Sequence, residues 1–487
     1  MAKHSYIRGD FQTPPELATK VWRDLGSLGE VNAIIEPTVG AGAFLQTAPD
    51  LLLKRRWICL DLNASYLDES QEIVRSRGFT NVHIEQRNAF DLSADLFSDL
   101  DPRQPLLAIG NPPWVTSAGQ GGFAVQNLPK KSNGRFGLMG LDAMTGKANF
   151  DIAEAILLRL LDAVAEFHDV RFAFLVKRSV AMKLCRRLLG TASELSFARI
   201  DAKAHFDAGV DAGLFVLRRT SDGRSVTSHV DIASEIGGHT IRRAGFKNDR
   251  FVEDLDSHAG SAHLEATDPV PWRQGVKHDA SKVLELTPTD GKLVNGFGEA
   301  VAIEREALCP LYKGSDVAND REPRRLFPLF QFDLSGPLAD LNSRWPLLWE
   351  YLEKHGDLFA ARRSRIYRGK PPFSIFGVGS YTMAPWKVVV SGLYPTARFR
   401  VIGPSSTGQP SLVDDTCYLL PFDHETDART VADHLNDCGP QQLLRALMDD
   451  GAKRPITKAL LARVEIPVRP VEPSVISVFP HQLSLAG

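Results

Sequence analysis

Cysteine is scarce in this chain, which has 5 cysteines among 487 residues, all far apart and none in a CxxC pair. A disulfide framework or a zinc ribbon needs closely paired cysteines, so the spacing predicts a reduced, cytoplasmic setting and no bound metal. Long apolar stretches are missing as well. No run approaches the roughly 20 residues that span a bilayer, and the first residues form no apolar signal region, so we expect no membrane association.

A marked excess of one charge is also absent, because 57 Lys and Arg residues are matched by 59 Asp and Glu residues. If the partner is a nucleic acid, the basic surface must therefore be local. The hydrophobic fraction of 43% is ordinary for a globular protein, and the length is enough for two or more domains.

The first 220 residues do contain a regular alternation of apolar strands and helical segments such as 151–167. We expect strands at 31–37, 57–63, 82–90, 106–110, 170–176 and 213–219. Strands that alternate with helices predict an α/β fold with a doubly wound, mostly parallel sheet. Ligands of such sheets bind at the carboxyl ends of the strands, which is where Glu36, Asp61, Asn88 and Asn111 are placed.

Two glycines follow the first expected strand, in the sequence EPTVGAGAF. Gly40 and Gly42 permit a tight turn and a close approach of the backbone to a ligand. Asp61 comes 19 residues after Gly42, a spacing at which an acid accepts hydrogen bonds from ribose hydroxyls. Together these residues predict a nucleoside-containing cofactor. NAD is disfavoured because the third glycine of its fingerprint is missing.

The sequence LLAIGNPPW, residues 106–114, ends an apolar strand in Asn111, Pro112, Pro113 and Trp114. The exocyclic amine of adenine is a poor nucleophile, because its lone pair is delocalised into the ring. Two acceptors on its N–H groups would localise that pair, namely the Asn111 side-chain oxygen and the Pro112 carbonyl, which the two prolines hold in a fixed direction. Trp114 offers a π-face for a base turned out of a duplex.

These motifs resemble class I S-adenosylmethionine-dependent methyltransferases, specifically the amino-methylating DNA enzymes with an [N/D/S]PP[Y/F/W] motif. They follow the gamma-class order at 11–22, 34–45, 60–63, 87–92, 109–114 and 199–217. The resemblance implies that Thr13 and Pro14 lie along the methionine part of S-adenosylmethionine. It also implies that Glu36 lies near the cofactor amine, that Gly40 and Gly42 form the turn beneath it, and that Asp61 binds the ribose.

The same resemblance implies further roles at the cofactor adenine and at the target base. Asn88, or the nearby Asp91, would accept from the adenine amine of the cofactor, and Phe90 would pack on that ring. Phe206 would be a second stacking aromatic, so that the target base is sandwiched between Trp114 and Phe206.

The remaining segments predict how DNA is bound. The glycine-rich segment 115–149, with Lys130 and Lys131, is expected to be a loop that orders over DNA. Residues 221–270 are interpreted as a linker, and 271–487 as a mixed α/β target-recognition domain. A basic run without acids lies at 361–370 and predicts phosphate contacts through Arg362, Arg363, Arg365, Arg368 and Lys370.

The sequence thus predicts a DNA adenine-N6 methyltransferase of restriction–modification type, acting as a monomer on double-stranded DNA, with a separate cognate endonuclease as a possible partner. A cytosine-N4 DNA methyltransferase stays open as an alternative, as does an NPP-motif enzyme that acts on RNA or on a protein glutamine. A non-enzymatic module with a degenerate cofactor site is disfavoured by the intact strand-end residues.

Overall fold

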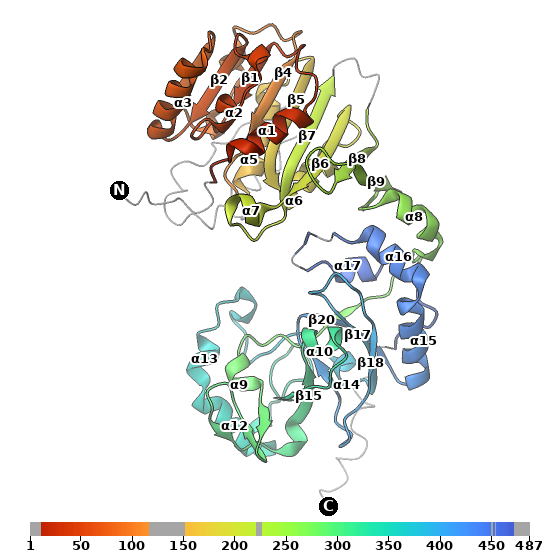
Figure 1. Cartoon of the computed structure of the whole chain (residues 1–487). Helices are drawn as coiled ribbons and strands as arrows, with labels where there is room; N and C mark the ends of the chain where they lie inside the picture. Colours follow the sequence, from red (N-terminus) through yellow and green to blue (C-terminus); the bar gives the residue numbers. More distant parts are fainter. Residues whose placement is uncertain (1–10, 116–150, 221–225, 450, 453, 472–487) are drawn as a thin grey trace, which may run out of the picture. The chain divides into compact units, whose positions relative to one another are not determined.

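The computed structural model describes residues 11–115, 151–220, 226–449, 451–452 and 454–471. The chain divides into two compact units, Met1–Leu255 and Asp256–Gly487, and each is described by itself (Figure 1). Among the described residues, no helix combines the length and the apolar character that a membrane span requires.

The first unit is built on a ten-stranded sheet with the order β10-β9-β8-β6-β7-β5-β4-β1-β2-β3. Strands β1 to β5 run parallel, β7 runs antiparallel between β5 and β6, and β6 pairs in parallel with β8. This arrangement confirms the doubly wound, mostly parallel fold class. The strands are β1 (Ala33–Glu36), β2 (Arg56–Asp61), β3 (Val82–Gln86), β4 (Leu106–Gly110), β5 (Asp169–Lys177), β6 (Glu194–Ile200), β7 (Ala212–Thr220), β8 (His229–Ala233), β9 (Thr240–Lys247) and β10 (Arg250–Val252).

Helices cover both faces of this sheet and bury its central strands on both sides. All five residues of β4 are buried: Leu107 and Ile109 pack in one hydrophobic cluster, and Leu106 and Ala108 in another. The first cluster includes helices α1 (Pro15–Asp24), α2 (Ala43–Gln46), α3 (Ala64–Arg77) and α7 (Ala202–Phe206). The second includes α5 (Ile152–Ala163) and α6 (Arg178–Leu188).

The segment 221–270, expected to be a linker, extends the catalytic sheet instead. Strands β8, β9 and β10 lie within it, and the boundary between the units falls after residue 255. Val230 and Ile232 are fully buried and belong to the same hydrophobic cluster as the buried residues of α6. The sequence signal was weak because β8 and β10 are short and β9, TIRRAGFK, contains few apolar residues.

The second unit contains three small sheets and several helices, consistent with the expected mixed α/β domain. The sheets have the orders β11-β20-β17-β18, β12-β13-β14 and β16-β15-β19. Their strands are β11 (Arg273–Gln274), β12 (Thr287–Thr289), β13 (Lys292–Val294), β14 (Ala300–Val301), β15 (Leu308–Tyr312), β16 (Arg325–Pro328), β17 (Trp386–Ser391), β18 (Arg400–Ile402), β19 (Leu412–Val413) and β20 (Cys417–Phe422).

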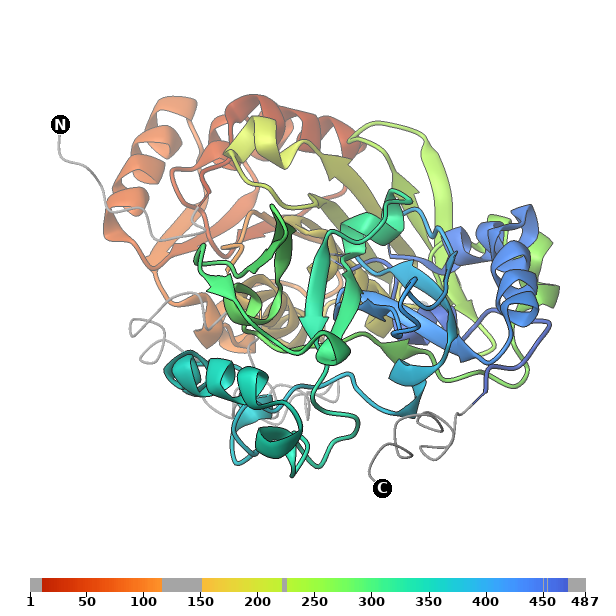
Figure 2. The same ribbon diagram turned by 90° about the horizontal axis from the view of Figure 1, so that it is seen from below.

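Helix α15 packs against three strands of the four-stranded sheet, and α16 packs against α15. Both are drawn in blue in Figures 1 and 2. The helices are α8 (Leu255–Ser261, which begins at the unit boundary), α9 (Ser281–Leu284), α10 (Gly314–Ala318), α11 (Leu341–Arg344), α12 (Pro346–Lys354), α13 (Gly356–Ala360), α14 (Ser380–Met383), α15 (Glu425–Asn436), α16 (Cys438–Leu447) and α17 (Lys458–Leu461).

Candidate active site

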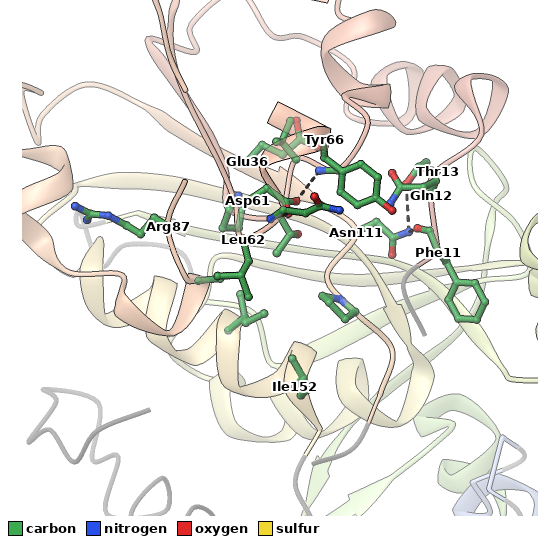
Figure 3. Close-up of a pocket in the computed structure, with 18 of the residues that line it drawn as sticks. Phe11, Gln12, Thr13, Glu36, Asp61, Leu62, Tyr66, Arg87, Asn111 and Ile152 are labelled. Carbon is green, nitrogen blue, oxygen red and sulfur yellow. Dashed lines mark hydrogen bonds between the residues drawn. The ribbon is translucent and has the colours of Figure 1, made fainter. Parts of the chain in front are cut away.

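A cavity of about 340 Å³ lies at the carboxyl ends of β1, β2, β3 and β4 (Figure 3). Parallel strands place their carboxyl ends along one edge of a sheet, so residues distant in sequence meet there. The cavity is lined by eight of the residues that the sequence singled out: Thr13, Glu36, Gly40, Asp61, Asn88, Phe90, Asn111 and Pro113.

Asn111 lies directly after β4, and among the described residues only the nitrogen end of its amide is hydrogen-bonded. Its Nδ2 donates hydrogen bonds to the carbonyl of Phe11 at 2.9 Å and to Oγ1 of Thr13 at 3.2 Å (Figure 3). A carbonyl can only accept, so these contacts fix which end of the amide is nitrogen. The Oδ1 atom is buried and has no hydrogen-bonding partner among the described residues.

Glu36 ends β1 and is buried, with 1% of its surface exposed. Its Oε2 atom also has no hydrogen-bonding partner in the part of the chain that the structure describes. Burial raises the pKa of this carboxyl well above its usual value, and the nearby charge of Asp61 raises it further. A carboxyl in this environment favours its protonated form until a cation enters the cavity.

Asp61 ends β2 and is held by two backbone N–H groups. Its Oδ2 accepts from the Gly40 amide at 2.9 Å, and its Oδ1 accepts from the Asn63 amide at 2.9 Å. Each carboxylate oxygen can accept a further hydrogen bond. These hydrogen bonds therefore hold the glycine turn and Asp61, at the end of the next strand, in one fixed arrangement.

The two glycines of the turn have different functions. Gly40 has a φ of +54°, a left-handed conformation that strains any other residue, and a β-carbon there would lie 2.5 Å from Oε1 of Gln12 and displace that side chain. Gly42 precedes α2 with a φ of +78°, and a β-carbon there would meet Ile73 and Ser70 of α3 at 3.0 and 3.1 Å. Gly42 thus serves helix packing and does not line the cavity.

Four expected site residues are placed less directly than the sequence suggested. Pro14 precedes α1 and Pro112 is buried, and neither lines the cavity. Asn88 lines the cavity, while its Oδ1 also accepts from the Phe90 amide at 3.0 Å. Asp91 is exposed and lies outside the lining, so Asn88 is better placed of the two.

The expected aromatic pair is in direct contact. The ring of Trp114 is buried, its Nε1 donates to the Leu175 carbonyl at 3.0 Å, and it meets Phe206 edge to face at a centroid distance of 5.0 Å. Phe11 lies 5.4 Å from Trp114 and 5.7 Å from Phe206. This cluster leaves no gap for a base between Trp114 and Phe206, so the predicted sandwich requires a ring to move.

The lining residues that were missed from the sequence include Phe11, Gln12, Thr38 and Tyr66. Gln12 accepts from the Ala41 amide at 2.9 Å through its Oε1, and the buried Oγ1 of Thr38 has no hydrogen-bonding partner. Phe11, Gln12 and Thr38 lie inside motifs that the sequence had already marked. The signal was therefore present, but polar residues inside a motif do not reveal which of them face the cavity.

The basic run at 361–370 belongs to the second unit and is not uniform. Arg362 is half-buried, and its guanidinium donates to the carbonyls of Phe359, His278 and Ser374 at 2.7 to 3.1 Å and stacks on Tyr367. These contacts give Arg362 a structural role within the second unit.

The other four cations of the run, Arg363, Arg365, Arg368 and Lys370, are exposed. The expected DNA loop at 115–149, with Lys130 and Lys131, lies outside the described residues apart from Val115. Among the described residues, no group of three or more potential metal ligands is present.

Comparison with known proteins decides the family. No family model matches the chain. It is, however, 36% identical over 475 residues to the type II methyltransferase M.NspV of Nostoc sp., a match that covers 94% of this chain and 96% of that protein. The chain belongs to the type II methyltransferases. It is thus a restriction–modification enzyme that transfers methyl groups to DNA, and S-adenosylmethionine is its cofactor, as the sequence predicted.

Solved structures give weaker likenesses to this methyltransferase. One is a modification subunit ascribed to a type I restriction enzyme of Vibrio vulnificus, with 16% identity, 47% of each chain covered and a TM-score of 0.32. Another is TrmN of Thermus thermophilus, with 19% identity, 42% of this chain and 48% of that chain covered, and a TM-score of 0.27. At these scores the likenesses identify neither substrate nor activity.

Proposed function

We propose that this methyltransferase methylates the N6 amine of adenine in double-stranded DNA, on a base turned out of the duplex. The observation that carries the proposal is the amide of Asn111, whose nitrogen is occupied by Phe11 and Thr13 and whose oxygen is buried without a partner. An orphaned acceptor at the cofactor cavity suits an incoming N–H donor, because an unsatisfied buried polar atom gains the most from a partner.

Two acceptors on the amine explain the chemistry. The Asn111 oxygen and the Pro112 carbonyl would each accept one N–H of the exocyclic amine and so localise its lone pair on nitrogen. S-adenosylmethionine supplies an electrophilic methyl group on a sulfonium. As the N–CH3 bond formed and the S–CH3 bond of the sulfonium broke, leaving a neutral thioether, these fixed acceptors would stabilise the positive charge that develops on the amine. One amine proton would then pass to water.

The cavity residues fit this cofactor. The buried, unpartnered Oε2 of Glu36 suits the charged amine of the methionine part, and the held carboxylate of Asp61 suits the ribose hydroxyls. Asn88 would accept from the adenine amine, with Phe90 against the ring. The turn at Gly40 would enclose the methionine part.

The target base would stack on the aromatic cluster. Phe206 and Phe11 are half-buried, whereas Trp114 is buried and hydrogen-bonded beneath them. We propose that Phe206 moves to admit the base against Trp114, and that Phe11 completes the wall. Stacking on such rings is worth about 1–3 kcal/mol per base.

The second unit would read the DNA, with phosphates contacted by Arg363, Arg365, Arg368 and Lys370. The loop with Lys130 and Lys131 would contact DNA as well. One chain with its own reader acts as a monomer in this proposal, and a separate endonuclease would recognise the same sequence.

Product analysis tests the substrate. DNA from a host that expresses the chain is digested to nucleosides and analysed by mass spectrometry, beside DNA from a host that expresses Asn111→Ala. We expect N6-methyladenine in the first sample only. N4-methylcytosine in its place would refute the adenine assignment, and modified RNA or protein without modified DNA would refute DNA as the substrate.

The first prediction separates the roles of Asn111 and Trp114. Asn111→Ala should abolish methyl transfer yet still allow base extrusion, because the amide acts on the amine and the rings act on the base. Turnover and the fluorescence of DNA with 2-aminopurine at the target position measure the two steps. Trp114→Ala should lower both signals and Trp114→Phe should keep much of both; near-parent turnover of Asn111→Ala would contradict the lone-pair argument.

A further inference from the structure

The orientation of the Asn111 amide depends on the segment that precedes α1. Its two N–H groups have two separate acceptors, the Phe11 carbonyl at 2.9 Å and the Thr13 hydroxyl at 3.2 Å. The torsion of an Asn amide is broad when nothing holds it. Two acceptors in fixed positions therefore define the direction of Oδ1, and removal of either one leaves the amide held by a single hydrogen bond.

The segment itself is held on both sides. Gln12, between the two acceptors, accepts from the Ala41 amide at 2.9 Å and so ties the segment to the glycine turn. On the other side, Pro14 and Pro15 lead into α1, whose Leu17 is buried in the core. A residue before proline is restricted to extended conformations, which limits the backbone of Thr13.

We propose that Thr13 is a positioning residue for methyl transfer, which acts through Asn111. Its hydroxyl accepts from the amide nitrogen and thereby aims Oδ1 at the amine of the target base. The inference rests on the proposed function of Asn111. It differs from the cofactor contact that the family resemblance implies for Thr13, because a cofactor contact would change cofactor affinity, whereas positioning changes the rate of the methyl-transfer step.

Three variants of the full chain test the proposal. Thr13→Val keeps the shape and the β-branched backbone preference but removes the acceptor. Thr13→Ser restores the acceptor. Thr19→Val is the matched control, since the exposed hydroxyl of Thr19 bonds only to the Pro15 carbonyl of its own helix. Each variant is measured for thermal stability, for S-adenosylmethionine affinity by calorimetry, and for the single-turnover methylation rate at saturating cofactor and DNA.

We expect Thr13→Val to lower the single-turnover rate about 10-fold, the effect of one lost hydrogen bond, with cofactor affinity unchanged. Thr13→Ser should recover most of the rate, and Thr19→Val should match the parent. If Thr13→Val does not fold, Thr13→Ala takes its place with the same expectation.

Two results would overturn the inference: a parental rate in Thr13→Val, or a lowered rate accompanied by weaker cofactor binding, which would make Thr13 a cofactor contact. These failures are distinct from failure of the proposed function. An inactive Asn111→Ala beside a parental Thr13→Val rejects only the role of Thr13, whereas an active Asn111→Ala rejects the function itself.

Discussion

At the scale of single residues, the cavity contains three polar atoms that have no hydrogen-bonding partner within the described ranges. Oε2 of Glu36, Oγ1 of Thr38 and Oδ1 of Asn111 are all buried in this state, and all three residues line the cavity. An unsatisfied buried polar group costs about 1–3 kcal/mol. A bound ligand that forms hydrogen bonds with these atoms would offset this free-energy cost, and this accounts for their position together at the cavity.

Glu36 gives a prediction about pH. Its pKa is raised in the folded protein by burial and by Asp61, so the folded state holds a proton that the unfolded state loses. The free energy of unfolding of the ligand-free protein should therefore fall as pH rises from the ordinary Glu pKa toward the raised one. Glu36→Gln should remove this dependence, which denaturant unfolding across pH can measure.

The same pKa makes cofactor binding release a proton, because the cationic amine of S-adenosylmethionine favours the ionised carboxyl. Calorimetry in buffers of different ionisation enthalpy should detect the release in the parent and not in Glu36→Gln. Glu36→Gln should also bind the cofactor more weakly while being no less stable. Proton release that persists in Glu36→Gln would assign it to another group.

At the scale of elements, the sequence predicted the strand ends well and the contacts between distant segments poorly. An apolar run followed by Glu36, Asp61 or Asn111 marks both a buried strand and the polar group at its end, so both follow from local pattern. The contacts of Arg362 depend on the carbonyl of His278, 84 residues away. The contact between Trp114 and Phe206 depends on how β4 and α7 pack. Neither can be seen in a local pattern.

The loop at 361–370 gives a prediction at this scale. Replacement of Arg363, Arg365 and Arg368 by Ala should weaken binding to DNA of any sequence and reduce the log–log salt slope by about 0.9 for each lost phosphate contact. The measurement is DNA affinity at several salt concentrations. Arg429→Ala with Arg445→Ala, on the exposed faces of α15 and α16, is the control. A parental slope in the loop variant would make these residues solvated surface only.

At the scale of the whole molecule, the catalytic unit extends to residue 255. Arg178, with 1% of its surface exposed, pairs with Glu253 at 2.8 Å, just beyond β10. Without β8 to β10 this buried cation loses that partner, and the side of β6 that pairs with β8 is exposed. Loss of one partner of a buried pair costs about 3–5 kcal/mol.

This extension predicts the behaviour of fragments. A fragment of residues 1–255 should fold and bind S-adenosylmethionine with near-parent affinity, since every described cavity residue lies within it. A fragment of residues 1–220 should be less stable by several kcal/mol and prone to associate through its exposed strand edge. Chemical unfolding and gel filtration of the two fragments compare them directly. Equal stability would show that β8 to β10 are dispensable.

One backbone hydrogen bond beside the cavity bears on where related enzymes can differ in length. The Ile152 amide donates to the Val115 carbonyl at 3.0 Å, and Ile152 and Pro113 both line the cavity. The chain between 115 and 152 therefore begins and ends at one point of the fold. A junction with its ends already together tolerates insertion and deletion, because loop-closure entropy changes slowly with length. In evolutionary terms, a gene can therefore gain or lose codons between positions 115 and 152, beside the active site, and leave the sheet that builds the cavity intact.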